Sequence, residues 1–286
     1  MRSPAYAIAW SLLAFLAGPA LETASAADSP IITEPHAGQV FQRDRNGRAT
    51  IPVVLAPAEA AKVKSVELQP LGLHLEGNAF ENVPTGGPYS LQILMMTDGG
   101  SALASAGPFY VGDLWVLAGQ SNMEGVGDLV EVTPPNDRVM LLGMGGQWYR
   151  AEEPLHWLVD SPDPVHSGDP STRAERAAGA HKTRRKGAGL GLPFAVSMVN
   201  ATNVPIGLVA CAHGGTSMEQ WNPSKKDEGG NSLYGSMMRQ VKLAGGKVKG
   251  VLWYQGEAEA NAKSSQVFPK VFADFIGAVR QDFGQP

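Results

Sequence analysis

The sequence predicts an α/β protein in which a small all-β domain precedes a larger domain built on a parallel sheet. Across residues 28–108, short apolar or alternating runs are separated by turn signals rich in Gly, Asn and Asp. From residue 110 onward, strand-like apolar runs alternate with helical patterns, which is typical of parallel βα units. The 34 glycines and 21 prolines favour many tight turns over a helical bundle.

Residues 1–26 are predicted to be a secretory signal. Arg2 supplies the positive charge, residues 7–16 the short apolar core, and Ala24-Ser25-Ala26 an A-x-A cleavage site. The apolar run is too short for a membrane span, although an uncleaved N-terminal anchor is the competing interpretation. We therefore expect a secreted or periplasmic protein, cleaved near Ala26, with no membrane contact after cleavage.

Charge and cysteine content narrow the classes of protein further. A formal net charge of −4 gives no electrostatic basis for binding nucleic acid. The single cysteine, Cys211, rules out an intrachain disulfide, so packing must stabilise the fold. We expect Cys211 to be a small buried apolar side chain, because it lies in a strand-like run over residues 205–212.

The all-β domain is expected over residues 27–108. Strands are predicted at residues 50–55, 63–71 and 89–95, with turns between them about every ten residues. This spacing indicates a small β-sandwich. Its expected role is to cover the next domain, and carbohydrate binding is the alternative.

The α/β domain is expected over residues 109–286. The predicted elements are strands at 114–118, 206–212 and 248–254 and helices at 192–200, 232–243 and 267–283. The polar, Pro-rich stretch between them, residues 152–185, has no clear periodicity and is predicted to be an insertion loop over the functional face. The basic run at residues 181–186 is interpreted as a solvated loop, or alternatively as an attractor for an acidic sugar.

Small and polar residues follow each predicted strand. Ser121 comes directly after the first strand and its terminal Gly119-Gln120, residues 213–221 follow the second, and residues 254–259 follow the third. A further glycine-rich segment, residues 187–191, precedes the first helix. The carboxyl ends of parallel strands meet at one edge of a sheet, so these loops are expected to converge on Ser121. A hydroxyl, a base and oxyanion donors are what acyl transfer requires.

Three of these segments together resemble a known family. GQSNM, GLVACAHGGTSMEQW and VLWYQGE are similar, in this order, to motifs of the sialate O-acetylesterase-like group of SGNH hydrolases, which includes carbohydrate esterase family six. The resemblance covers residue 112 to the end of the sequence. It implies an SGNH-type, flavodoxin-like three-layer α/β/α domain and a serine esterase that needs no cofactor.

The resemblance also implies roles for individual residues. Ser121 matches the nucleophile, and its own backbone N–H and that of a glycine in residues 187–191, for which we choose Gly189, would donate to the oxyanion. Gln255 matches the side-chain oxyanion donor, a suitable role for an amide because it donates without titrating. Glu257 resembles the acidic residue that orients the base, and a helix-capping carboxylate is the alternative.

The remaining residues of the motifs receive less specific roles. Gln120 and Asn122, which flank Ser121, are expected to contribute to substrate or oxyanion binding. Glu219 and Trp221 are expected to be pocket-wall or structural residues. For His213, lining the acyl pocket and a structural hydrogen-bonded role are both open.

The catalytic base is where the sequence departs from the family pattern. The family supplies it from a C-terminal Asp-x-x-His, and this sequence ends at Phe283-Gly-Gln-Pro286 without that segment. We therefore expect either that the α/β domain is incomplete at its C-terminal end or that the base has moved. Asp163-Pro-Val-His166 spells Asp-x-x-His inside the insertion loop, so His166 is the candidate for a relocated base.

The sequence thus predicts an esterase that hydrolyses O-acetyl esters of carbohydrates through an acyl-serine intermediate. The expected partner is an acetylated carbohydrate, with sialic acid and acetylated polysaccharides such as xylan both open, and the oligomeric state is not predicted. The alternative is a catalytically impaired carbohydrate-binding protein with the same fold. A lipase-like esterase is disfavoured because no long apolar lid is present, and no metal is expected because no His, Asp or Glu pair has suitable ligand spacing.

Overall fold

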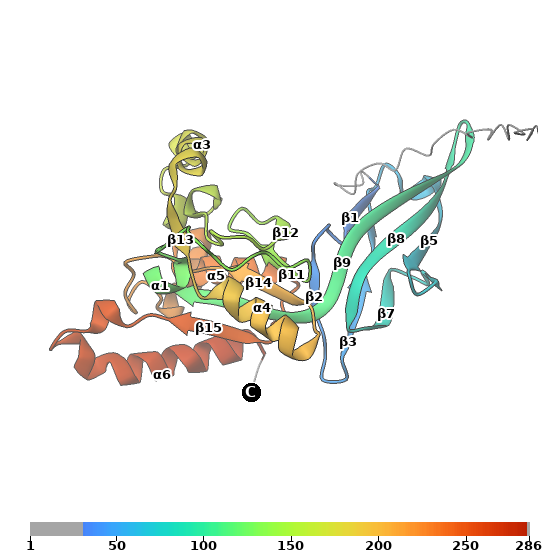
Figure 1. Cartoon of the computed structure of the whole chain (residues 1–286). Coiled ribbons are helices and arrows are strands. Elements are labelled where there is room, and N and C mark those ends of the chain that lie inside the picture. Colours follow the sequence, from blue (N-terminus) through green and yellow to red (C-terminus); the bar gives the residue numbers. More distant parts are fainter. Residues whose placement is uncertain (1–30, 285–286) are drawn as a thin grey trace, which may run out of the picture.

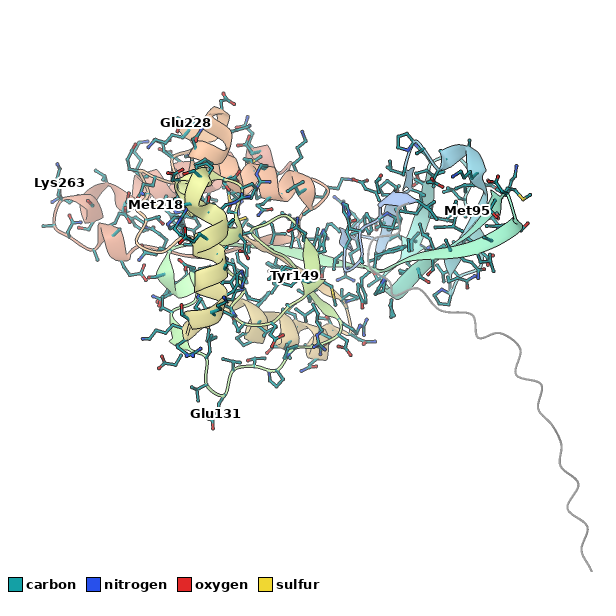
Figure 2. All side chains as sticks on the ribbon, turned by 90° about the horizontal axis from the view of Figure 1, so that it is seen from above. Met95, Glu131, Tyr149, Met218, Glu228 and Lys263 are labelled. Carbon is teal, nitrogen blue, oxygen red and sulfur yellow. The ribbon has the colours of Figure 1, made fainter. Side chains whose placement is uncertain are left out.

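A computed structural model of the chain describes residues 31–284 as two lobes that share one long strand, β9 (Figure 1). The predicted signal at residues 1–26 lies outside the described residues. Viewed from above, Met95 marks the smaller β lobe and Met218 the larger α/β lobe (Figure 2). Within residues 31–284 no helix has the length and apolar character needed to cross a membrane.

The smaller lobe consists of small sheets around one apolar core. Its elements are β1 (Ile32–Glu34), β2 (Val40–Gln42), β3 (Arg48–Pro52), β4 (Val54–Leu55), η1 (Ala60–Lys62), β5 (Val63–Gln69), β6 (Leu73–His74), β7 (Ala79–Pro84) and β8 (Gly86–Thr97). β6, β5, β8 and the first half of β9 form an antiparallel sheet, while β1 pairs with β4 and β3 with β7. Ile51 of β3 and Phe80 of β7 are buried in one cluster with Leu68 of β5 and Leu91 of β8, so the β3–β7 pair covers the larger sheet.

β9 (Gly100–Gly119) joins the lobes as one continuous strand of 20 residues. Its first half pairs with β8, its middle with β2, and its last residues with β14 and β15. The domain boundary expected at residues 108–109 therefore falls inside a hydrogen-bonded strand. A bidentate ion pair also stabilises the junction between the lobes. Arg43 Nε and Nη2 donate to Asp113 Oδ1 and Oδ2 at 2.8 and 2.9 Å.

The larger lobe is a mixed sheet covered by helices. Its strands are β10 (Gly127–Asp128), β11 (Val139–Leu142), β12 (Trp148–Arg150), β13 (Lys186–Ala188), β14 (Ile206–Ala210) and β15 (Gly250–Tyr254). The main sheet has the order β12-β11-β14-β9-β15, in which only β12 runs antiparallel to its neighbour. β11 and β12 were not predicted, since a run of four apolar residues is too short to stand out in the sequence.

The helices of this lobe are α1 (Ser121–Glu124), η2 (Leu158–Asp160), α2 (Pro164–Ser167), η3 (Pro170–Thr172), α3 (Arg173–Thr183), α4 (Gly191–Thr202), η4 (Pro223–Asn231), α5 (Leu233–Leu243), η5 (Glu257–Glu259) and α6 (Ser264–Asp282). The three helices predicted from the sequence correspond to α4, α5 and α6. Ser232 accepts a hydrogen bond from the Gly235 N–H at 3.0 Å and so caps the start of α5.

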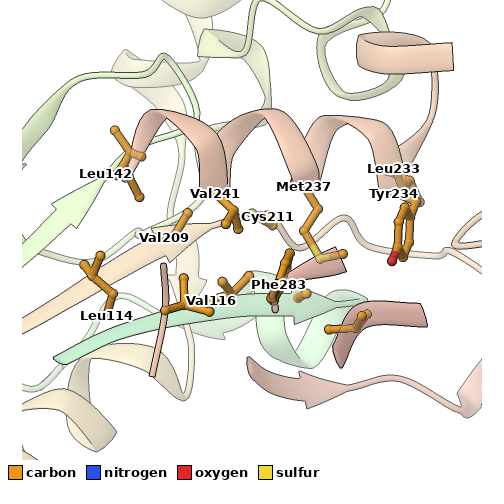
Figure 3. Packing of buried hydrophobic residues seen from close by; sticks show 14 of the residues in the cluster. Leu114, Val116, Leu142, Val209, Cys211, Leu233, Tyr234, Met237, Val241 and Phe283 are labelled. Carbon is orange, nitrogen blue, oxygen red and sulfur yellow. The ribbon is translucent and has the colours of Figure 1, made fainter. Parts of the chain in front are cut away.

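The alternation of side chains along β9 produces two packed faces. Leu114 and Val116 point toward α5, where they pack in one cluster with Met237 and Val241 (Figure 3). Leu117 points the other way, into the cluster under α4. The helices therefore cover both faces of the sheet, with α4 on one side and α5 and α6 on the other (Figure 1).

The stretch at residues 152–185, predicted to be an irregular loop, is in fact partly helical. It contains α3, a helix of 11 residues, together with the short η2, α2 and η3. The prediction failed for a physical reason: α3 buries none of its residues, so it has no apolar stripe from which a helical period could be read.

Candidate active site

Ser121 is the first residue of α1, which follows the carboxyl end of β9 and lies on the side of the larger lobe away from the β lobe (Figure 1). Gly119 ends the strand with a φ of 129°, and the Gln120 N–H donates to Tyr254 O at 2.9 Å. Ser121 then opens α1 and is half-buried. Within residues 31–284, neither its Oγ nor its backbone N–H has a hydrogen-bond partner, so both are available to a ligand.

The loop after β14 lies directly against Ser121. The His213 N–H donates to Gly119 O at 3.0 Å, and the Gly214 N–H donates to Glu124 Oε2 at 2.6 Å. A Cβ atom on Gly214 would lie 2.9 Å from Glu124 Oε2 and 3.6 Å from Ser121 Cβ, so the glycine leaves room for the Glu124 carboxylate while the loop lies in van der Waals range of Ser121. Burial raises the pKa of Glu124, and its bond to Gly214 and the nearby Arg184 oppose this shift.

The next residue of this loop, Gly215, carries a backbone N–H with no acceptor among residues 31–284. The loop is held from behind, since Thr216 Oγ1 donates to His213 O at 2.7 Å and the Trp221 indole donates to Thr216 Oγ1 at 2.9 Å. Trp221 is fully buried. The Gly214-Gly215 turn was quoted in the sequence motif but was not selected as a donor, because only the fold shows which glycine touches Ser121.

The loop after β15 approaches Ser121 from the other side. The exposed Glu257 accepts a hydrogen bond from Asn122 Nδ2 at 2.6 Å, so the loop is tied to the residue that follows Ser121. Gln255 is buried, and its Nε2 donates both to Thr216 O at 3.2 Å and to Glu259 Oε2. Both amide protons are thus used inside the protein, and Oε1 is buried without a partner among the described residues.

Glu259 was missed by sequence reasoning. It is 9% exposed and accepts hydrogen bonds from Met218 N at 2.8 Å and from Gln255. The more exposed Glu257 was chosen because the family motif points to it. The sequence does not show which of the two carboxylates is buried, since the turn of η5 decides which one faces inward.

Gly189 lies beside the end of α1, but its N–H is engaged. A Cβ atom on Gly189 would lie 3.2 Å from Gly125 Cα, and its N–H donates to Glu153 Oε1 at 3.1 Å. Burial raises the pKa of Glu153, whereas the hydrogen bonds that it accepts from the N–H groups of Gly189 and Leu155, and the charge of Arg184, oppose this shift. To act as the oxyanion donor expected from the sequence, the Gly189 N–H would have to give up its hydrogen bond to Glu153 and donate to the substrate instead.

His166 does not contact Ser121. Its Nδ1 lies 3.1 Å from His213 Nδ1, and its Nε2 lies 3.1 Å from Ser236 Oγ, so both ring nitrogens are used. Burial lowers the pKa of His166 to about 3, with smaller contributions from His213, His156 and Arg239. His166 is therefore joined to the site only through His213, and a direct proton transfer from Ser121 is not available to it in this arrangement.

Neither Cys211 nor a metal cluster is part of this arrangement. Cys211 is buried, as predicted, and burial raises the pKa of its thiol. No three His, Cys, Asp or Glu side chains of residues 31–284 are grouped in a way that could hold a metal ion.

Comparison with known proteins gives three findings. Residues 111–286 match the family described as carbohydrate esterase, sialic acid-specific acetylesterase. A probable carbohydrate esterase of Arabidopsis thaliana is 30% identical over an alignment of 173 residues, and the match covers 53% of this chain and 56% of that protein. The crystal structure of a carbohydrate acetylesterase from Xanthomonas citri aligns with a TM-score of 0.52 and 22% identity, covering 87% of this chain and 56% of that one. The chain thus spans 56% of the length of each of these two proteins, and the second likeness concerns the fold alone.

Proposed function

Because the chain belongs to the sialic acid-specific acetylesterase family of carbohydrate esterases, as its motifs predicted, we propose that it removes acetyl groups from carbohydrates through an acyl-serine at Ser121. The observation that carries the proposal is the position of Ser121. Its unbonded hydroxyl stands at the end of β9, where the loops after β14 and β15 both meet it.

The proposed reaction has two steps. Ser121 Oγ bonds to the acetyl carbonyl carbon while a base takes the hydroxyl proton, and the carbonyl oxygen becomes an oxyanion. Its collapse breaks the bond to the sugar oxygen, which leaves with that proton. A water molecule then attacks the acetyl-serine in the same way, releasing acetate and restoring Ser121.

The oxyanion requires hydrogen-bond donors that are already in place. We propose the N–H groups of Ser121 and Gly215 as these donors, since neither has an acceptor among the described residues and Gly215 follows the glycine that lies beside Ser121. Gln255 and Gly189 remain the donors implied by the family resemblance. Each would join the site only after giving up a bond, to Thr216 or Glu259 in one case and to Glu153 in the other.

Glu257 is proposed to position the site through Asn122. Its carboxylate accepts from the Asn122 amide at 2.6 Å and so fixes the start of α1, where the nucleophile lies. Gln120, next to Ser121 in the sequence, is buried, and its Oε1 has no partner among the described residues, so its expected contribution to substrate or oxyanion binding is kept in the proposal.

The finer fold assignment belongs to this proposal. If β11, which precedes β14 in the chain and lies outside it in the sheet, is counted as an added strand, the order β14-β9-β15 corresponds to the 2-1-3 order with which a flavodoxin-like sheet begins. We infer a flavodoxin-like core of the SGNH type. Export, with cleavage near Ala26, also remains a proposal that rests on residues 1–26 alone.

Release of acetate tests the proposed function. The chain without residues 1–26 is assayed on an acetylated sugar and on a small activated acetyl ester. We expect turnover of both, and loss of turnover in Ser121→Ala. Ser265→Ala, which changes an exposed residue at the start of α6, serves as the matched control and should retain full activity. A folded Ser121→Ala protein with unchanged activity would rule out the proposal.

The second candidate is a carbohydrate-binding protein without turnover. The engaged donors of Gln255 and Gly189 and the absence of contact between His166 and Ser121 favour it. Binding of an acetylated sugar by the folded wild-type chain, with no acetate released, would select this candidate.

A further inference from the structure

A line of buried polar side chains connects α5 to the loop beside Ser121. Arg239 Nε donates to Asp163 Oδ2 at 2.9 Å, and Ser236 Oγ lies 2.5 Å from the same oxygen. His166 then bridges from Ser236 to His213, with distances of 3.1 Å on both sides. Asp163, Ser236 and His166 are all less than 8% exposed.

The proton on each bond of this line can be assigned from chemistry. Asp163 forms an ion pair with Arg239, and a carboxylate only accepts hydrogen bonds, so the single hydroxyl proton of Ser236 points to Asp163. The Ser236 oxygen must then accept from His166 Nε2–H. Were the hydroxyl proton turned toward His166 instead, two oxygens with no proton between them would lie 2.5 Å apart.

The two imidazoles carry the same direction of hydrogen bonding onward to His213. A neutral His166 that carries its proton on Nε2 has a bare Nδ1, which can only accept. His213 Nδ1, at 3.1 Å, must therefore be the donor of this bond. Burial keeps both rings neutral near pH 7, since it lowers the pKa of His166 to about 3 and also lowers the pKa of His213.

His213 is fixed next to Ser121 through its backbone. Its N–H is bonded to Gly119 O, two residues before Ser121, and the following Gly214 lies against Ser121 itself. The His213 ring is half-buried, and its Nε2 has no hydrogen-bond partner within residues 31–284. His213 Nε2, which carries no proton when Nδ1 does, is thus also the ring nitrogen that has no hydrogen-bond partner among the described residues.

We propose that Asp163, Ser236 and His166 are positioning residues that hold His213 as its Nδ1–H tautomer, so that His213 presents an unprotonated Nε2 to a hydroxyl group at the Ser121 site. Such a nitrogen accepts a hydrogen bond from a hydroxyl. Two kinds of hydroxyl would lie in the site during the proposed reaction, that of Ser121 and those of the sugar. The proposal rests on the proposed function for the role of His213, but the tautomer itself does not depend on catalysis.

The tautomer is measured directly in the wild-type chain. Long-range proton–nitrogen NMR correlations of the imidazole rings distinguish Nδ1–H, Nε2–H and doubly protonated histidine, and His166→Gln and His213→Gln assign the signals. At pH 7 we expect Nε2–H for His166 and Nδ1–H for His213. His213 found as Nε2–H, or as imidazolium, would overturn the proposal whether or not the protein is an enzyme.

Breaking the line at one hydroxyl tests the positioning role. Ser236→Ala removes the acceptor of His166 Nε2–H without changing any group at Ser121, and His213 should then appear as a mixture of tautomers. Ser236→Thr keeps the hydroxyl and should restore the single Nδ1–H form. An unchanged single tautomer in a folded Ser236→Ala protein would show that the line does not set it.

Kinetics of His213→Ala on two substrates identify the hydroxyl. If Nε2 takes the proton of Ser121, kcat falls by roughly 10²–10⁴-fold on both a sugar acetate and a small acetyl ester that lacks hydroxyls. If Nε2 accepts from the sugar, KM for the sugar acetate rises by about tenfold and the small ester is unaffected. Unchanged constants on both substrates would contradict a role for His213. A wild-type chain with no turnover refutes the proposed function, and the NMR result then decides the tautomer separately.

Discussion

Replacement of Gly119 by alanine should distort the end of β9 on which Ser121 is placed. A Cβ atom there would lie 2.2 Å from Tyr254 O and 2.8 Å from its carbonyl carbon, and the φ of 129° is one that L side chains rarely adopt. The strained backbone costs roughly 1–3 kcal/mol. The hydrogen bond from Gln120 N to Tyr254 O at 2.9 Å would also be lost, at about 1 kcal/mol.

The free energy of unfolding of Gly119→Ala should therefore fall by about 3 kcal/mol, which lowers the midpoint of urea unfolding by about 1 M. Gly246→Ala is the matched control. Its φ is also positive, at 78°, but a Cβ atom there would have no heavy atom within 4 Å, so only the backbone strain applies. Displacement of Ser121 should also reduce kcat by roughly 10²-fold in Gly119→Ala alone. Equal midpoints for the two variants, with normal activity, would refute the close contact between β9 and β15.

Two further predictions concern pH and the junction of the lobes. Burial holds the pKa of His156 at about 4 and that of His166 at about 3, below the unfolded value of 6.5, so the unfolded chain binds more protons and stability should fall as pH drops from about 6.5 toward 4. The buried Glu124 and Glu153, whose pKa values are raised, change stability with pH in the opposite direction, so the histidine contribution is isolated with a variant. Urea unfolding at several pH values should show that the free energy of unfolding depends less steeply on pH in His156→Gln than in the wild type. An equal pH dependence would contradict the role given to His156. Arg43→Ala should lower the free energy of unfolding by about 3 kcal/mol, because it leaves the buried carboxylate of Asp113 without its partner. Arg43→Ala combined with Asp113→Ala should recover part of this loss in the same unfolding assay, and a double variant no more stable than the single one would argue against the ion pair.

The sequence predicted those elements whose signal is local. Residues 114–118 form a continuous apolar run, and they are the buried end of β9 because both faces of the sheet are covered by helices. The helix expected at residues 232–243 could also be predicted from local signals, since its apolar side chains recur at a helical period and Ser232 marks its start.

What the sequence did not predict depends on contacts between distant residues. That β9 extends back to Gly100 follows from its pairing with β8, and residues 100–105 are mostly exposed and carry no strand-like alternation of burial. In the site, Glu153 accepts a hydrogen bond from the N–H of Gly189 across 36 residues, and Thr216 O accepts one from the Gln255 amide across 39 residues. Which donors stay free is set by such pairings, so the motif predicted Ser121 as the nucleophile but not the hydrogen-bond partners of the residues around it.

The line of hydrogen-bonded side chains from Asp163 to His213 also depends on contacts between residues that are distant in the sequence. Asp163-Pro-Val-His166 was noticed because its spelling matched that of a catalytic motif. The structure places both residues in a buried network, but Ser236, from a helix 70 residues further on, separates them and fixes the direction of the protons. The chemistry of His166 therefore depends on a residue that no local motif could include.

The acetyl-enzyme intermediate gives the most direct test of the account. The chain is mixed with a small activated acetyl ester, quenched in acid within the first turnover, digested and analysed by mass spectrometry. We predict one added acetyl group on the peptide that contains Ser121, and none on that peptide in Ser121→Ala. Turnover of the ester with no acetyl group on Ser121, or with the group on another side chain, would contradict it.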